Sequence, residues 1–154
     1  MRINFYDTRI EEDNSIMLVK EKGVNYGVES LDNAKSIVNM LNEIMKLNKK
    51  AEEHIYLVGM NSKNKIAGVF FISKGTVNQC LVSRREIFIR LLLVGAVYFI
   101  VCHNHPSKDC SPSKDDIVLT KRLKEAGLLL NVPLVDHIIV GGDWYYSFNE
   151  QETL

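Results

Sequence analysis

Apolar side chains recur at helical spacing between residues 31 and 47, and this is the clearest periodic pattern in the chain. The stripe stops where Asn48 occupies its next position. This spacing predicts an amphipathic helix, and Ser30 precedes it as a candidate N-cap. The stripe consists of Ala34, Ile37, Val38, Leu41, Ile44 and Met45.

Short apolar runs between polar turns predict the strands. The first 30 residues hold two weak examples, at 3–6 and 16–19. A stronger pair flanks the turn sequence Asn61-Ser62-Lys63-Asn64 and predicts a hairpin. The run at 96–101 is wholly apolar, as expected for a buried central strand. The apolar runs after residue 30 lie at 55–60, 65–72, 96–101, 135–140 and 144–148.

Two further helices are predicted from their starting residues. Ser83 and Ser113 are each followed three residues later by an acidic residue, Glu86 and Asp116 respectively, which is the spacing of a capping box. Glycines then mark the helix ends, near residues 93 and 126. Helices therefore alternate with strands and hairpins, and the pattern predicts a single mixed α/β domain.

Composition and charge exclude several classes of protein. The 154 residues suit one domain, and 19 basic residues balance 19 acidic ones, so the strongly basic footprint of a nucleic-acid-binding protein is absent. The longest apolar run, 91–102, is shorter than the roughly 20 residues of a membrane-spanning helix. The cysteines are too few for a disulfide scaffold, so we read Cys80, Cys102 and Cys110 as free thiols and expect a soluble, cytoplasmic protein with no membrane partner.

The segment from residue 101 to residue 116 carries the clearest chemistry. His103 and His105 alternate at the end of a predicted strand, so both imidazoles can point to one side. A loop with two prolines then leads to Asp116 in the first turn of a helix. Two imidazoles and one carboxylate form a three-ligand set for Zn²⁺ that leaves the fourth tetrahedral position open, as in catalytic zinc sites.

Hydrolysis at such a site needs two further groups. Zinc lowers the pKa of bound water to about 7, but a base must take the proton of that water and pass it to the leaving amine. A donor must also stabilise the oxyanion. Ser113, beside the predicted ligand Asp116, is placed to be that donor, although Ser113 and Asp116 can also act together as a helix-capping pair.

The spacing His-x-His, seven residues, Ser, two residues, Asp resembles the signature of the JAMM (MPN+, JAB) metalloproteases. The longer string His103-Asn104-His105-Pro106-Ser107 resembles the RadC branch of that superfamily. Similarity extends over roughly residues 50–150 but not over the first 30, so we divide the chain into an N-terminal extension, 1–30, and a RadC-like JAB domain, 31–154. The other similar segments are Gly75-Thr76-Val77-Asn78, Arg85-Glu86, 136–141 and 146–148.

The resemblance implies an α/β JAMM/MPN fold related to cytidine deaminases, in which helices flank a mixed central sheet. It implies that zinc is held by His103, His105 and Asp116. It also implies a glutamate just before the first long core strand that holds the water and serves as the base. The matching position is Glu53. Glu52 is the alternative if the register slips by one, and Glu86, a third candidate by residue type alone, fits better as a helix cap.

The resemblance thus implies a zinc-dependent peptidase or isopeptidase with a peptide or isopeptide substrate. Two alternatives stay open: a DNA-repair-associated accessory module, which zero net charge does not favour, and a scaffold without turnover. One departure concerns Lys108, which replaces a glycine common in RadC-like loops and would be strained at positive φ. His54 and His137 are interpreted as structural residues, with Asp136 and His137 forming a satisfied pair in the core, although an Asp–His pair can also support the ligands of a metal site.

Overall fold

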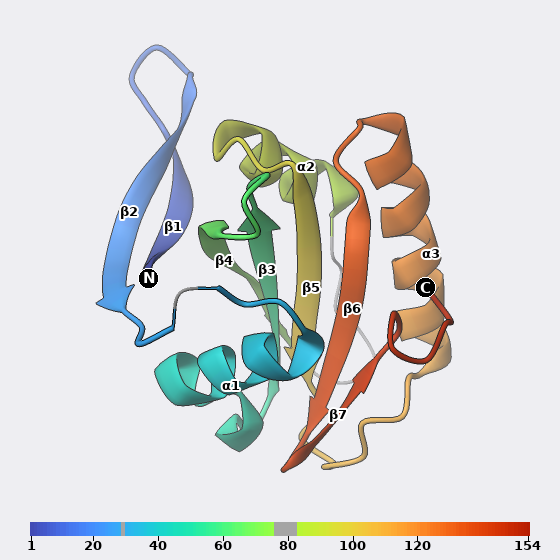
Figure 1. The fold of residues 1–154 in the computed structure, drawn as a ribbon. Helices are drawn as coiled ribbons and strands as arrows, with labels where there is room; N and C mark the ends of the chain where they lie inside the picture. Colours follow the sequence, from blue (N-terminus) through green and yellow to red (C-terminus); the bar gives the residue numbers. More distant parts are fainter. Residues whose placement is uncertain (29, 76–82) are drawn as a thin grey trace.

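A seven-stranded mixed sheet forms the centre of the molecule (Figure 1). The computed structural model describes residues 1–28, 30–75 and 83–154. The strand order is β2-β1-β4-β3-β5-β6-β7, with β1–β4 and β5–β6 parallel and the other neighbours antiparallel. The mixed α/β fold is therefore confirmed. The strands are β1 (Arg2–Ile10), β2 (Ile16–Asn25), β3 (Glu53–Met60), β4 (Ile66–Gly75), β5 (Tyr98–Asn104), β6 (Leu134–Gly141) and β7 (Trp144–Ser147).

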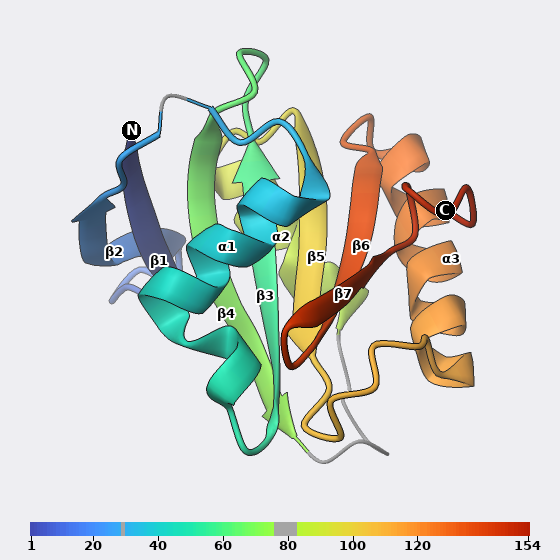
Figure 2. The same cartoon turned by 60° about the horizontal axis from the view of Figure 1, so that its bottom comes forward.

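Helices cover both faces of this sheet. Figure 2 shows α1 (Ala34–Met45) lying across one face, followed by the short 3₁₀ helix η1 (Leu47–Lys49). The other face carries α2 (Arg84–Leu93) and α3 (Lys114–Leu129). In the described part of the chain, every helix is too short or too polar to cross a bilayer.

The alternation of side chains along the central strands divides the core into two clusters. In β3, Tyr56 and Val58 pack towards α1, whereas Ile55 and Leu57 pack towards α2 and α3. The same alternation in β5 directs Val101 to the α2–α3 side. Because residues two apart share a face, His103 and Asn104 at the end of β5 point to opposite sides of the sheet.

Two of the predicted helix boundaries are wrong. Asn33, not Ser30, caps α1. Its Oδ1 accepts from the Ser36 backbone N–H at 2.8 Å, and its own backbone N–H donates to Ser36 Oγ, which completes a capping box. Gly127 does not end α3 but lies inside it. A Cβ at Gly127 would come within 2.6 Å of the Val132 carbonyl oxygen, so the glycine permits close packing.

Apart from β7, which ends at Ser147 and not at residue 148, the strands are longer than the apolar runs predict. β1 and β2 extend well beyond 3–6 and 16–19, because each continues through polar residues that face solvent in the hairpin. β5 begins at Tyr98 and ends at Asn104, so His103 belongs to the strand itself. The turn predicted at 61–64 and the hairpin around it are confirmed. Cys80 and the segment 76–78 lie outside the described residues.

Candidate metal centre

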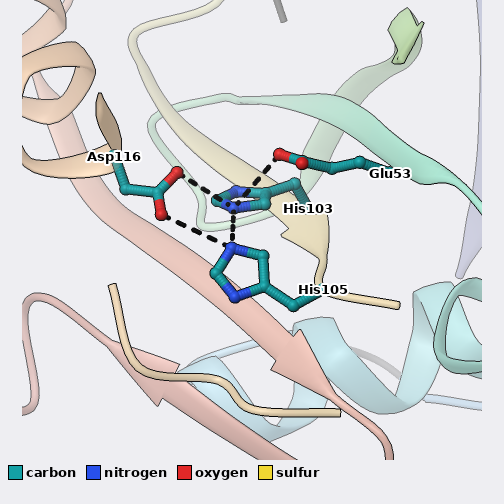
Figure 3. Close-up of side chains that lie close together, drawn as sticks. All are labelled: Glu53, His103, His105 and Asp116. Carbon is teal, nitrogen blue, oxygen red and sulfur yellow. Dashed lines mark hydrogen bonds and ion pairs between the residues drawn. The ribbon is translucent and has the colours of Figure 1, made fainter. Parts of the chain in front are cut away.

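Four side chains that are distant in sequence meet at the end of β5. Glu53, His103, His105 and Asp116 each present one ligand atom, and these four atoms all lie within 4.8 Å of one another. Figure 3 shows the carboxylates of Glu53 and Asp116 approaching the two imidazoles from opposite sides. Glu53, His103 and Asp116 are buried, and His105 is partly exposed. The cluster is therefore shielded on most sides and open to solvent at His105.

The distances within this cluster fit a small tetrahedral cation. A zinc ion with bonds of about 2.0–2.1 Å holds its nitrogen and oxygen ligands about 3.3 Å apart. His103 Nε2 lies 3.1 Å from His105 Nε2 and 3.2 Å from Asp116 Oδ1, and His105 Nε2 lies 3.4 Å from Asp116 Oδ2. The two histidines face different oxygens of Asp116, and one ligand atom from each member of the cluster lies within 4.8 Å of the others, so the arrangement is compatible with one shared ion.

Backbone contacts fix His105 in the loop that follows β5. Its backbone N–H donates to the Val140 carbonyl at 2.8 Å, which extends the β5–β6 pairing by one residue. Its Nδ1 lies 2.8 Å from the Asp109 carbonyl oxygen. Because a carbonyl only accepts, Nδ1 carries a hydrogen, and Nε2 is the nitrogen that can offer a lone pair to a metal ion. The loop thus selects the tautomer that binds a metal through Nε2.

Lys108 occupies the left-handed region at φ 67°, as its glycine-like position in the loop suggests. Its backbone N–H donates to the His105 carbonyl at 3.0 Å and closes the turn. Gly141 lies directly beneath, where a Cβ would come within 2.6 Å of the Lys108 carbonyl oxygen. The loop therefore accommodates a lysine at positive φ, and its backbone packs tightly on the end of β6.

Asp116 is oriented by the start of α3. Its Oδ2 accepts from the Ser113 backbone N–H at 2.7 Å and from Ser113 Oγ at 2.6 Å, while Ser113 Oγ accepts from Asp116 N at 3.1 Å. This reciprocal capping box holds Oδ2, so Oδ1 is the oxygen that faces His103. The Ser113 hydroxyl hydrogen is directed at Asp116, and its role as an oxyanion donor stays a prediction.

Asn104 anchors the segment that carries Glu53. Its Oδ1 accepts from His54 N at 2.8 Å, and its Nδ2 donates to the carbonyls of Lys50 and Glu52 at 3.3 and 3.1 Å. The Asn104 side chain is 2% exposed. These three bonds continue the pairing of β3 with β5 beyond its last backbone contact, and they place Glu53 Oε1 3.6 Å from His103 Nε2.

The other two candidate bases lie away from the cluster. Glu52 is half-exposed and pairs with Lys74 at 2.6 Å. Glu86 sits in the first turn of α2, where its backbone N–H is capped by Ser83 and its carboxylate pairs with Arg85 and Arg90. Of the three glutamates, the structure brings only Glu53 to the two histidines.

The electrostatics of the metal-free cluster follow from burial and from its hydrogen bonds. Burial raises the pKa of Glu53, and the nearby imidazoles offset this only in part. Burial alone would raise the pKa of Asp116 too, but hydrogen bonds from His103 and His105 hold that pKa well below its usual range. The hydrogen bond to Asp116 in turn raises the pKa of His105, so protons and a metal ion compete for the His105 ring.

The predicted pairing of His137 with Asp136 is wrong. Asp136 faces away from His137, and its carboxylate accepts from Ser147 Oγ and Asn149 N. His137 is fully buried and lies against His103 instead, with 3.0 Å between His137 Nε2 and His103 Nδ1. The contact arises from the parallel register of β6 with β5, in which His137 pairs with Val101, two residues before His103 on the same face of the sheet.

The molecule is an α/β domain with a mixed sheet, and a Glu-His-His-Asp cluster lies at the end of its central strand β5. These features define a domain of the JAB/MPN class with a candidate metal site. The chain matches the family model of the RadC-like JAB domain over residues 31–153. It therefore belongs to the RadC-like JAB domain family.

Curated relatives of the chain include several clostridial proteins. It is 40% identical to a UPF0758 protein of Clostridium novyi over 67% of the chain and 45% of that protein. A UPF0758 protein of Clostridium tetani is 36% identical over 87% of the chain and 57% of its own length. A UPF0758 protein of Clostridium botulinum is 40% identical over 77% of the chain and 51% of its own length. The chain spans about half the length of these relatives.

Proposed function

We propose that this domain is a zinc-dependent hydrolase that cleaves an amide bond, in a peptide or an isopeptide. The observation that supports this most is the meeting of Glu53 with His103, His105 and Asp116 at distances that suit one tetrahedral ion. A structural zinc site would use four protein ligands, commonly thiolates, whereas this cluster consists of two imidazoles and two carboxylates. JAB domains also include metalloproteases, which agrees with the proposal.

The proposal assigns a separate role to each side chain. His103 Nε2, His105 Nε2 and Asp116 Oδ1 hold the ion. A zinc ion bound there supplies a Lewis acid and a water that ionises near neutral pH. Glu53 is the fourth member of the cluster, and its raised pKa suits a group that first accepts a proton and then releases it.

The reaction balances with Glu53 as the sole proton carrier. The water oxygen bonds to the carbonyl carbon while Glu53 Oε1 takes a proton from that water. Glu53 then gives the proton to the leaving nitrogen as the C–N bond breaks. The products are a carboxylic acid, which ionises in water, and an amine. Ser113 supports the oxyanion in this scheme if its hydroxyl hydrogen turns from Asp116 Oδ2 to the substrate.

The chain supplies a matched pair of variants for testing the base. Glu53→Gln removes the base and should reduce cleavage of a mixed peptide and isopeptide library by about 10²–10⁴-fold, with zinc still bound through the three ligands. Glu52→Gln, at a half-exposed neighbour that pairs with Lys74, should leave cleavage unchanged. A zinc-loaded wild type that cleaves no member of the library would contradict the hydrolase and favour a scaffold.

A further inference from the structure

Three buried polar side chains form a hydrogen-bonded relay behind His103. His103 Nδ1 lies 3.0 Å from His137 Nε2, and His137 Nδ1 lies 2.6 Å from Thr120 Oγ1. Thr120 Oγ1 donates to the backbone carbonyl of Asp116 at 2.6 Å. All three side chains belong to residues that are at most 3% exposed. The relay therefore connects one proposed ligand with the backbone of another, entirely inside the protein.

The direction of the relay follows from counting hydrogens. The Thr120 hydroxyl has one hydrogen, which its contact with the Asp116 carbonyl uses, because a carbonyl only accepts. Thr120 Oγ1 must then accept from His137 Nδ1–H. A neutral imidazole carries a single N–H, so His137 Nε2 accepts from His103 Nδ1–H. With Nδ1 occupied in this way, His103 Nε2, the atom that faces His105 and Asp116, is the nitrogen that can offer a lone pair to a metal ion.

An arrangement that would reverse the relay has a hydrogen on both nitrogens of His137. It would place a cation at a residue that is 0% exposed and whose ring stacks on Phe148, with centroids 5.1 Å apart and planes 8° from parallel. Burying a charge in this way is costly. It would also put a hydrogen on His103 Nε2, where a metal ion needs a lone pair.

We propose that His137 and Thr120 are positioning residues that hold His103 in the tautomer required for metal binding. Phe148 stacks on the His137 ring and holds its plane, and Thr120 Oγ1 keeps the ring hydrogen on Nδ1 by accepting from it. Partners of this kind commonly change metal affinity by about 10–100-fold. The inference rests on the proposed metal site, and it assigns that site a second layer of residues from α3 and β6.

Two substitutions at Thr120 separate the relay from simple packing. Thr120→Val keeps the shape of the side chain but removes its hydroxyl, and it should weaken zinc binding to the full chain about 10-fold or more. Thr120→Ser keeps the hydroxyl and should retain the wild-type affinity. Competition with a chelating dye measures both affinities, and urea unfolding of the metal-free variants shows how far each fold is destabilised.

The tautomers supply a readout that packing alone would not change. Long-range ¹⁵N–¹H correlations of the zinc-loaded wild type should show His103 and His137 both protonated on Nδ1, and Thr120→Val should give a tautomer mixture at His137. A wild type that binds no zinc would overturn the proposed metal site and the relay with it. Zinc binding that Thr120→Val leaves unchanged, or a His137 protonated on Nε2, would overturn the relay alone.

Discussion

Asn104 should stabilise the fold through the segment that carries Glu53. Its side chain is buried and makes three hydrogen bonds to the backbone of Lys50, Glu52 and His54. Each such bond contributes about 0.5–1.5 kcal/mol net, and its loss leaves a buried backbone group without a partner. We therefore expect Asn104→Ala to lower the free energy of unfolding by about 2–4 kcal/mol.

A second asparagine serves as the matched control. The Asn61 side chain likewise bonds to the backbone, where its Oδ1 accepts from the N–H groups of Lys63 and Lys65, but it does so on an exposed turn. Water can replace those bonds, so Asn61→Ala should cost no more than about 1 kcal/mol.

The assay is urea unfolding of the metal-free chains. For a protein of this size, the expected loss in Asn104→Ala corresponds to a fall in Tm of about 4–16 °C. The same variant should hydrolyse substrate more slowly than wild type, because Glu53 is less firmly held against His103. Equal decreases in the free energy of unfolding for Asn104→Ala and Asn61→Ala would refute the role assigned to Asn104.

Three further predictions concern the loop and His105. Lys108→Gly should raise the free energy of unfolding by up to about 1 kcal/mol, because glycine adopts positive φ without the cost that lysine incurs. A lower free energy of unfolding in urea than that of wild type would contradict this. Gly141→Ala should destabilise the chain by about 1–3 kcal/mol and weaken zinc binding, since its Cβ would meet the Lys108 and Cys110 backbone at 2.6 Å; unchanged zinc affinity would count against it. His105 has a raised pKa, so the stability that it adds to the metal-free protein is fully present below about pH 6.5 and is lost as the pH rises through its folded pKa. The difference in unfolding free energy between wild type and His105→Gln should therefore shrink between pH 6 and pH 8, and a difference that grows would contradict the cause assigned here.

Local patterns predicted the fold where a few neighbouring residues decide the structure. The turn at 61–64 and the start of α3 at Ser113 follow from side chains that bond to their own backbone neighbours. Gly127 has a different cause, because the need for glycine there comes from Val132, which only the folded chain brings close. The helix therefore continues past a residue that local rules treat as its end.

The candidate site shows the same division between local and long-range causes. The spacing of His103, His105 and Asp116 is local, so the sequence alone points to these three ligands. The choice between Glu52 and Glu53 depends on the pairing of β3 with β5, in which Ile55 lies opposite His103. The contact between His137 and His103 depends on the parallel pairing of β5 with β6, which no single stretch of sequence encodes.

The most direct test of this account is the metal content of the purified protein, combined with X-ray absorption at the zinc edge. We expect about one zinc per chain, with nitrogen and oxygen ligands at about 2.0–2.2 Å and no sulfur. His103→Ala and Asp116→Ala should each lose the ion. A wild-type chain that takes up no zinc, or one whose zinc is bound by sulfur, would contradict the account.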